Sequence, residues 1–113
     1  MTRHDDMIRL RHMLDYAREA VALVQGRTRL DLDRNRLLEL ALVRLVEIVG
    51  EAARQVSESG RARYPSIPCR EVMGMRNRLV HGYDEVDFDV LWDTITADLP
   101  PLIAELEKIV PQG

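Results

Sequence analysis

The sequence predicts an all-α fold, a bundle of four main helices in a single domain that spans residues 1–113. Hydrophobic residues make up 46% of the chain and aromatic residues only 4%, so the core must consist mostly of aliphatic side chains and methionine. Apolar residues also recur at alternating spacings of three and four, which is the period of one face of an α-helix. A chain of 113 residues is long enough for one hydrophobic core.

The first helix is expected from about Arg3 to Val24. Its apolar stripe consists of Met7, Leu10, Leu14, Ala17, Val21 and Val24. Gly26 is expected to stop this helix, because glycine commonly follows a helix C-terminus. Residues 27–35 are polar and are expected to form a turn, with Asp33 as a candidate N-cap of the next helix.

The second helix is expected from about Arg34 to Ser59, and it is apolar around most of its circumference, which is typical of a central helix. Its polar residues form one narrow stripe at spacings of three and four: Arg44, Glu47, Glu51, Arg54 and Glu58. Neighbours in such a stripe can pair along the helix. Gly50 lowers helix propensity by roughly 1 kcal/mol relative to alanine, so we expect it at a close contact with another helix.

A loop is expected over residues 60–66, followed by a third helix. Pro68 suits the first turn of that helix, where its missing N–H has no consequence. Glu71 is then favourably placed near the positive end of the helix dipole. The helix is expected to reach Gly82, which could end it in a left-handed turn.

The fourth helix is expected to begin near Asp87 or Phe88. It carries an apolar stripe: Val90, Leu91, Ile95, Leu99, Leu102, Leu106 and Ile109. Pro100-Pro101 must kink or break it, because proline removes a backbone donor and its ring clashes with the preceding turn.

Charge is distributed unevenly along the chain, although the net charge is only −3. Residues 61–83 hold five arginines against the single acid Glu71, whereas residues 84–113 hold eight acids against Lys108. An arginine-rich proteome would produce the same bias. A local arginine cluster nevertheless predicts a patch that binds phosphate or RNA. Its candidate members are Arg61, Arg63, Arg70 and Arg78.

Several classes of protein are disfavoured. The single cysteine, Cys69, cannot form an internal disulfide and fits a reducing compartment. Charged residues interrupt the N-terminal stretch, so no signal peptide is expected, and no apolar run is long enough to span a membrane. We therefore expect a cytoplasmic protein without a membrane partner. His4 and His12 are eight residues apart, which does not fit a zinc site, and no metal or cofactor is expected.

The segment from Met75 to Tyr83 carries the chemistry. It reads Met75-Arg76-Asn77-Arg78-Leu79-Val80-His81-Gly82-Tyr83. Arginine can hold a phosphate through a planar fork of donors, and histidine can move a proton near neutral pH. Together they predict transesterification of RNA without a metal. His81 would be the general base on a ribose 2′-OH or the general acid on the leaving oxygen. Arg76 would hold the scissile phosphate, and Asn77 would orient His81 or donate to the phosphate.

The expected helix does not bring these side chains together by itself. Arg76 and His81 would diverge by roughly 140° and lie about 7.5 Å apart along the axis. Gly82 could end the helix and let His81 swing, or two copies could pool their motifs across a two-fold axis. A simpler interpretation makes His81 a cationic C-cap, leaves the arginines solvated, and packs the Tyr83 ring over the helix end.

Three segments resemble the HepT-like branch of the HEPN domain family. They are Ile67 to Tyr83, Ile48 to Ala53, and the stretch from Val86 through Trp92 with Asp98-Leu99-Pro100. The resemblance covers nearly the whole chain, and the R-x4-H-x-Y signature is quite specific in this context. Cys69 is a departure, because the family often has tryptophan there. It should affect packing at the start of the third helix more than chemistry.

The resemblance implies an antiparallel helical homodimer with the Arg/His motif at the dimer cleft and metal-independent ribonuclease activity. By this resemblance Arg76 and His81 are the catalytic pair and Asn77 is a supporting polar residue. HepT-like members are toxins of type VII toxin–antitoxin pairs. Their antitoxin, MntA, is a nucleotidyltransferase that transfers AMP from ATP to the motif tyrosine, here Tyr83. The added phosphate would repel an RNA backbone two residues from His81.

The sequence therefore predicts a cytoplasmic, homodimeric endoribonuclease toxin that acts on RNA, such as tRNA or mRNA, and leaves 2′,3′-cyclic phosphate ends. The main alternative is a non-catalytic HEPN module that binds RNA or nucleotide, or that presents Tyr83 to a nucleotidyltransferase. A plain helical dimerisation subunit is a third possibility. Glu47 and Glu51 could form a carboxylate pair, although an ion-pair stripe with Arg44 and Arg54 is the simpler interpretation. Glu51 or Arg44 could also reach the cleft and position Arg76.

Overall fold

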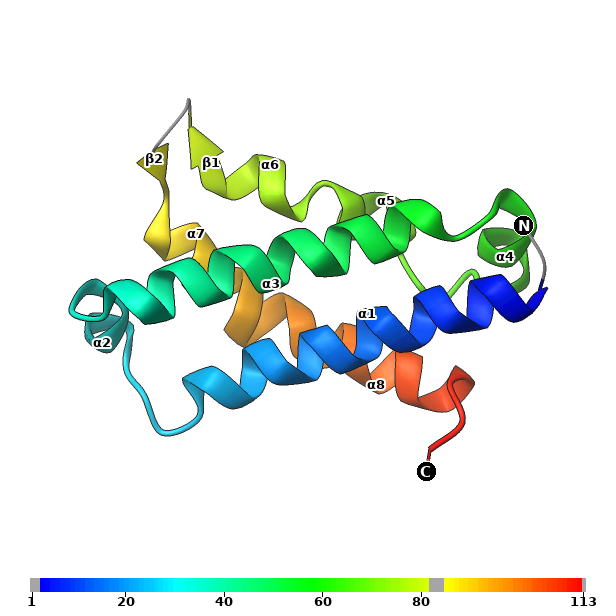
Figure 1. The fold of residues 1–113 in the computed structure, drawn as a ribbon, viewed down its shortest axis with the longest axis horizontal. Coiled ribbons are helices and arrows are strands. Elements are labelled where there is room, and N and C mark those ends of the chain that lie inside the picture. Colours follow the sequence, from blue (N-terminus) through cyan, green and yellow to red (C-terminus); the bar gives the residue numbers. More distant parts are fainter. Residues whose placement is uncertain (1–2, 82–84, 113) are drawn as a thin grey trace.

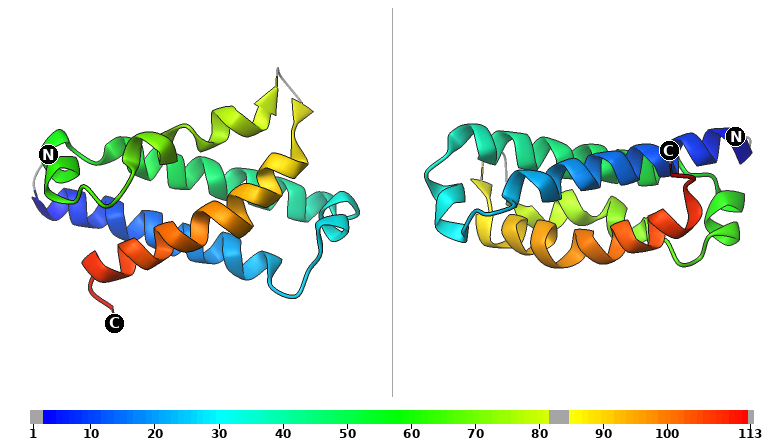
Figure 2. Two further views of the ribbon diagram at one scale, coloured as in Figure 1. Left: turned by 180° about the vertical axis from the view of Figure 1, so that it is seen from behind. Right: turned by 90° about the horizontal axis from the view of Figure 1, so that it is seen from below.

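The computed structural model describes residues 3–81 and 85–112, and it confirms the all-α class. The long helices α1 (Arg3–Val24) and α3 (Arg36–Gln55) run antiparallel in one layer. The segments from α5 to α8 form a second layer packed against them, as the view from below shows (Figure 2). The molecule measures about 42 × 32 × 19 Å. Within the described ranges, no helix is both long and apolar enough to cross a membrane.

Side chains from both layers meet in one aliphatic core, as the low aromatic content predicts. The following are among its fully buried members: Leu10, Leu14, Leu42, Val46, Leu91, Ile95, Leu99 and Leu106. These residues come from α1, α3 and the last helical segment, so their burial holds the two layers together. The core is therefore built largely from the apolar stripes that the sequence displays.

The connection between α1 and α3 contains a short helix, α2 (Arg29–Asp33), where the sequence predicted a turn. Gly26 ends the preceding helix with a φ of +73°, a left-handed conformation that glycine adopts readily. The predicted N-cap Asp33 was wrong, because its carboxylate pairs with Arg29 at 2.8 Å as the last residue of α2. Asn35 caps α3 instead, and its Oδ1 accepts from the Leu38 N–H at 3.0 Å.

The second expected helix ends earlier than predicted, at Gln55, and a short helix α4 (Glu58–Arg63) replaces part of the expected loop. Ser57 starts α4, since its Oγ accepts from the Gly60 N–H at 3.0 Å. The buried carboxylate of Asp6 accepts from the Ser57 N–H at 2.9 Å and from its hydroxyl at 2.6 Å. A long-range contact to α1 thus fixes this turn, which explains why local sequence did not reveal it.

Gly50 lies where α3 touches α5 (Cys69–Met73). A Cβ at this position would come within 3.3 Å of the Val72 carbonyl oxygen. The predicted close helix contact is therefore confirmed, and the absence of a side chain at Gly50 lets the two backbones approach.

The third expected helix is divided and shorter than predicted. Gly74 separates α5 from α6 (Met75–Leu79), and the chain then enters strand β1 (Val80–His81). Strand β1 pairs in antiparallel fashion with β2 (Glu85–Val86), with Val80 opposite Val86. The prediction of a helix up to Gly82 was wrong, because the β-branched Val80 adopts extended geometry and gains a strand partner. Gly82 itself lies outside the described residues.

The last helical segment consists of α7 (Phe88–Asp93), a π-helical turn η1 (Thr94–Asp98) and α8 (Leu99–Ile109). Asp87 caps α7 by accepting from two backbone N–H groups. The wide turn comes just before Pro100 and Pro101, which occupy the first turn of α8. The prolines therefore disturb the helix as predicted, and a π-turn absorbs the disturbance without ending the helical run.

Candidate active site

Helix α6 presents the arginine half of the motif. Met75 and Leu79, four residues apart, are buried and anchor the helix against the core. The residues between them, Arg76, Asn77 and Arg78, are exposed. Two buried anchors on one side thus leave three polar side chains available at the surface.

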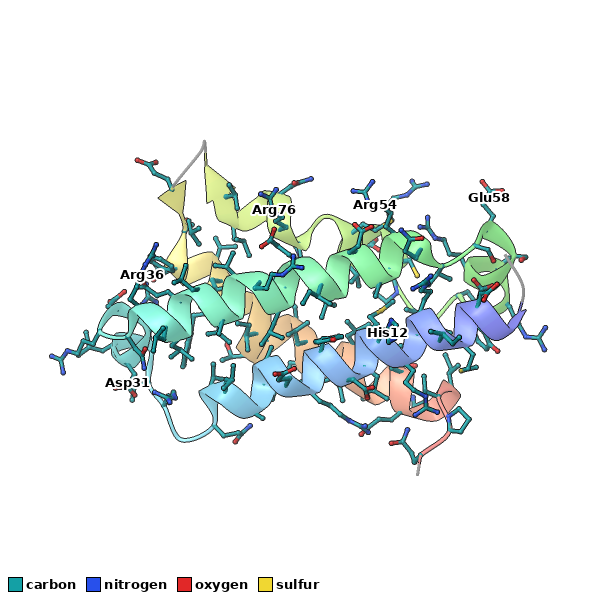
Figure 3. The ribbon with its side chains drawn as sticks, in the orientation of Figure 1. His12, Asp31, Arg36, Arg54, Glu58 and Arg76 are labelled. Carbon is teal, nitrogen blue, oxygen red and sulfur yellow. The ribbon has the colours of Figure 1, made fainter. Side chains whose placement is uncertain are left out.

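The two arginines of α6 diverge. Positions two apart on a helix are rotated by about 200°, and Arg76 accordingly faces α3 whereas Arg78 faces η1. The Arg78 guanidinium lies 3.8 Å from the Asp98 carboxylate. Figure 3 shows Arg76 above α3, between Arg36 and Arg54 along the length of that helix.

Arg76 is held by Glu47, a contact that sequence reasoning missed. Its Nε donates to Glu47 Oε2 at 3.1 Å, with 51% of the Arg76 side chain and 31% of the Glu47 side chain exposed. The sequence had suggested Glu51 or Arg44 for this role. Glu51 instead lies 3.5 Å from Arg54 and accepts from Gln55, which fits the predicted ion-pair stripe. The exposed Arg76–Glu47 pair contributes roughly 0–1 kcal/mol to the stability of the fold. Its main effect is therefore to orient the Arg76 guanidinium.

The histidine half of the motif is carried by a strand. The His81 backbone pairs opposite Glu85, and a further hydrogen bond from Asp87 N–H to the Leu79 carbonyl (2.7 Å) closes the base of the hairpin. The side chain of His81 lies outside the part of the structure that is described, as does Tyr83 entirely. Because His81 follows the end of α6 by two residues, the helical divergence expected between Arg76 and His81 does not apply.

A groove runs beside the motif, between α3 and the hairpin. It has a volume of about 720 Å³, and its apolar lining residues are Leu40, Val43, Val86 and Phe88. Its charged lining residues have both signs: Arg36, Arg44, Glu39, Glu47, Glu85 and Asp87. Since Glu47 lines the groove and also contacts Arg76, the groove lies beside the Arg76 guanidinium.

The arginines predicted to bind RNA do not gather in one place. Arg61 and Arg63 belong to α4, at the opposite end of the molecule from the hairpin (Figure 1). The Arg61 guanidinium donates to the Ala53 and Arg54 carbonyls at the C-terminus of α3 (3.2 and 3.4 Å). Arg63 is exposed and lies over the Tyr64 ring.

Arg70 is exposed on α5, nearer to the motif. RNA binding by Arg61, Arg63, Arg70 and Arg78 stays a prediction. The structure adds that Arg61 also supports the end of α3, where a cation is favourable.

Other reactive side chains occupy structural positions. Cys69 is buried, and this burial raises the pKa of its thiol despite the nearby Arg61 charge. His12 packs edge-on against Tyr16, with ring centroids 6.5 Å apart. Among the described residues, no group of three or more His, Cys, Asp or Glu side chains could hold a metal ion.

Comparison with known proteins identifies sequence similarity to one family over most of the chain. The family model "Ribonuclease HepT-like" matches residues 13–109. A Methanocaldococcus jannaschii protein named "Putative RNase MJ1216" is 31% identical, with 97% of this chain and 91% of the relative aligned. "Probable ribonuclease HepT" of Thermococcus cleftensis is 36% identical, with 80% of this chain and 86% of the relative aligned. No solved structure matches the chain significantly.

Proposed function

Because the chain belongs to the ribonuclease HepT-like family, we propose that it is a metal-independent endoribonuclease that acts as the toxin of a toxin–antitoxin pair in the cytoplasm. The observation that carries the proposal is the exposed Arg76 guanidinium, oriented by Glu47 beside a groove and mounted on the helix that leads directly into the strand of His81.

The proposed reaction is a transesterification at one phosphodiester. The ribose 2′-oxygen attacks phosphorus, a bond from that oxygen to phosphorus forms, and the bond to the 5′-oxygen breaks. One imidazole accepts the proton of the 2′-OH and a second donates a proton to the leaving 5′-oxygen. Arg76 stabilises the charge that builds on the equatorial phosphate oxygens. Asn77 supports Arg76 and His81 by orienting His81 or by donating to the phosphate. The products end in a 2′,3′-cyclic phosphate and a 5′-hydroxyl.

Two imidazoles in one cleft require two copies of the motif, and we propose that the protein is a homodimer. Leu37 and Leu40 support this proposal, because 80% and 51% of these residues are exposed at the start of α3. Leu40 also lines the groove beside Arg76. A second copy seated on these leucines would lie next to the first motif, and the mixed charges that line the groove suit an isologous contact.

Control by an antitoxin is proposed from the family resemblance. An MntA-like nucleotidyltransferase would adenylylate Tyr83, placing a negative phosphate beside the RNA-binding cleft. Tyr83 lies outside the described residues, so this proposal depends on its position in the R-x4-H-x-Y signature. Intact mass of protein co-expressed with the nucleotidyltransferase tests it. Added AMP units that disappear in Tyr83→Phe are expected, and unchanged mass beside an active nucleotidyltransferase would contradict the proposal.

The catalytic proposal is tested by incubating the purified protein with RNA in the presence of EDTA. Cleavage with 2′,3′-cyclic phosphate ends is expected. Arg76→Ala and His81→Ala should each lower the rate at least ~10²-fold, and Asn77→Ala should lower it less. Arg54→Ala, which removes an exposed arginine from α3, is the matched control. Binding of RNA without cleavage by the unmodified protein would favour the non-catalytic module instead.

A further inference from the structure

Glu47 and Arg76 come from helices that differ greatly in length and in packing. Glu47 belongs to α3, a helix of 20 residues that packs against α1 and α5. Arg76 belongs to α6, a helix of five residues. The contact between them therefore ties the Arg76 side chain to α3, the most extensively packed helix among the described residues.

The contact engages one edge of the guanidinium. Glu47 Oε2 accepts from Nε at 3.1 Å, and among the described residues no other acceptor is bonded to this group. The two terminal nitrogens therefore remain available as a parallel pair of donors, the arrangement that arginine uses to grip a phosphate. The carboxylate thus restricts the orientation of the guanidinium without occupying its phosphate-binding end.

The same carboxylate also reduces the attraction of Arg76 for RNA, because it is a negative charge beside the cation. Loss of the Glu47 charge should therefore have two opposite effects. RNA should bind at least as tightly, while the guanidinium should be less well aligned with the phosphate when charge develops. Small errors of alignment are costly to rate, since a shift of about 1 Å can lower it ~10²-fold.

We propose that Glu47 is a positioning residue for the cleavage step, acting through the Nε of Arg76. The inference rests on the proposed ribonuclease function. It assigns a role to a residue outside the R-x4-H-x-Y signature, and it makes α3 part of the active site.

The test compares Glu47→Gln with Glu51→Gln. Glu51 is an appropriate control because it lies one turn along the same polar stripe and faces Arg54 rather than the motif. Single-turnover cleavage is measured at saturating RNA, and affinity is measured separately with RNA that carries a 2′-deoxyribose at the cleaved position. In Glu47→Gln the maximal rate should fall about 10-fold with affinity unchanged or higher. Glu51→Gln should match the unsubstituted protein, and Glu47→Asp should recover part of the rate.

An unchanged maximal rate in Glu47→Gln would overturn the inference while leaving the ribonuclease proposal intact. Absence of cleavage by the unsubstituted protein would instead refute the ribonuclease proposal. The contact between Arg76 Nε and Glu47 is tested independently of cleavage by ¹⁵N NMR of the arginine Nε–H groups. The Arg76 Nε–H signal should shift and exchange faster with water in Glu47→Gln than in Glu51→Gln. An identical signal in both variants would also overturn the inference.

Discussion

The exposed leucines of α3 provide a quantitative test of dimer formation. In the single chain, Leu37 is 80% exposed and Leu40 is 51% exposed. The double variant Leu37→Lys with Leu40→Lys removes this apolar surface. Full burial of a leucine side chain contributes about 1.5–3 kcal/mol. Scaled by these exposed fractions and counted in both copies of an isologous dimer, the two leucines would contribute about 4–8 kcal/mol to association. The dissociation constant should then rise by about three to six orders of magnitude.

The assay is sedimentation equilibrium over a range of concentrations, paired with thermal unfolding followed by circular dichroism. The double variant should be monomeric with native helical content, since neither leucine belongs to the core. Ile8→Lys is the control, because Ile8 is 37% exposed near the other end of the α1–α3 layer and should not affect association. Ribonuclease activity should disappear with the dimer. A double variant that dimerises as tightly as the unsubstituted protein would refute the assignment of this face.

Three further predictions follow from local geometry. Gly60→Ala should destabilise the fold by about 1–3 kcal/mol in a thermal melt, because the new Cβ would lie 2.5 Å from the buried Asp6 carboxylate. Gly74→Ala is the control, because a Cβ there meets nothing closer than 3.6 Å, and it should leave stability nearly unchanged. Burial raises the pKa of the Cys69 thiol above its ordinary value of 9.0. The thiol therefore keeps its proton to a higher pH in the folded state than in the unfolded state. The free energy of unfolding should therefore fall as pH rises past 9.0, and Cys69→Ala should abolish this component of the pH dependence in urea titrations. Arg61→Gln should lower stability by about 1–2 kcal/mol, and an unchanged urea midpoint would show that its bonds to the end of α3 are dispensable.

Periodicity predicted the long helices well, because each carries a continuous apolar stripe that has to face the core. It gave the bounds of α1, and the low helix propensity of glycine predicted the close approach at Gly50. It failed where a long-range contact decides local structure. The α3 helix stops at Gln55 because Asp6, 51 residues from Ser57 in the chain, captures the Ser57 N–H and starts a new helix. No local pattern contains that information.

In the candidate site too, local pattern predicted some features and long-range packing decided the others. The sequence identified the segment that carries Arg76, since an arginine, an amide and a histidine in close succession have recognisable chemistry. It could not choose among the acids of the α3 stripe, because Glu47 and Glu51 occupy equivalent positions in a helix pattern. Only the packing of α6 against α3 distinguishes Glu47 from Glu51.

The two halves of the motif are supported independently, and this has a consequence for how the site can be tuned. Arg76 is oriented by buried anchors of α6 and by a carboxylate from α3. The backbone of His81 is held by pairing with Glu85 in β2, and β2 continues through the Asp87 cap into α7. Changes in the hairpin can therefore alter the position of His81 while the arginine remains fixed. In the mechanism that we propose, a modification in the connection between β1 and β2 would act on the histidine half first, so it would stop proton transfer while Arg76 still binds phosphate.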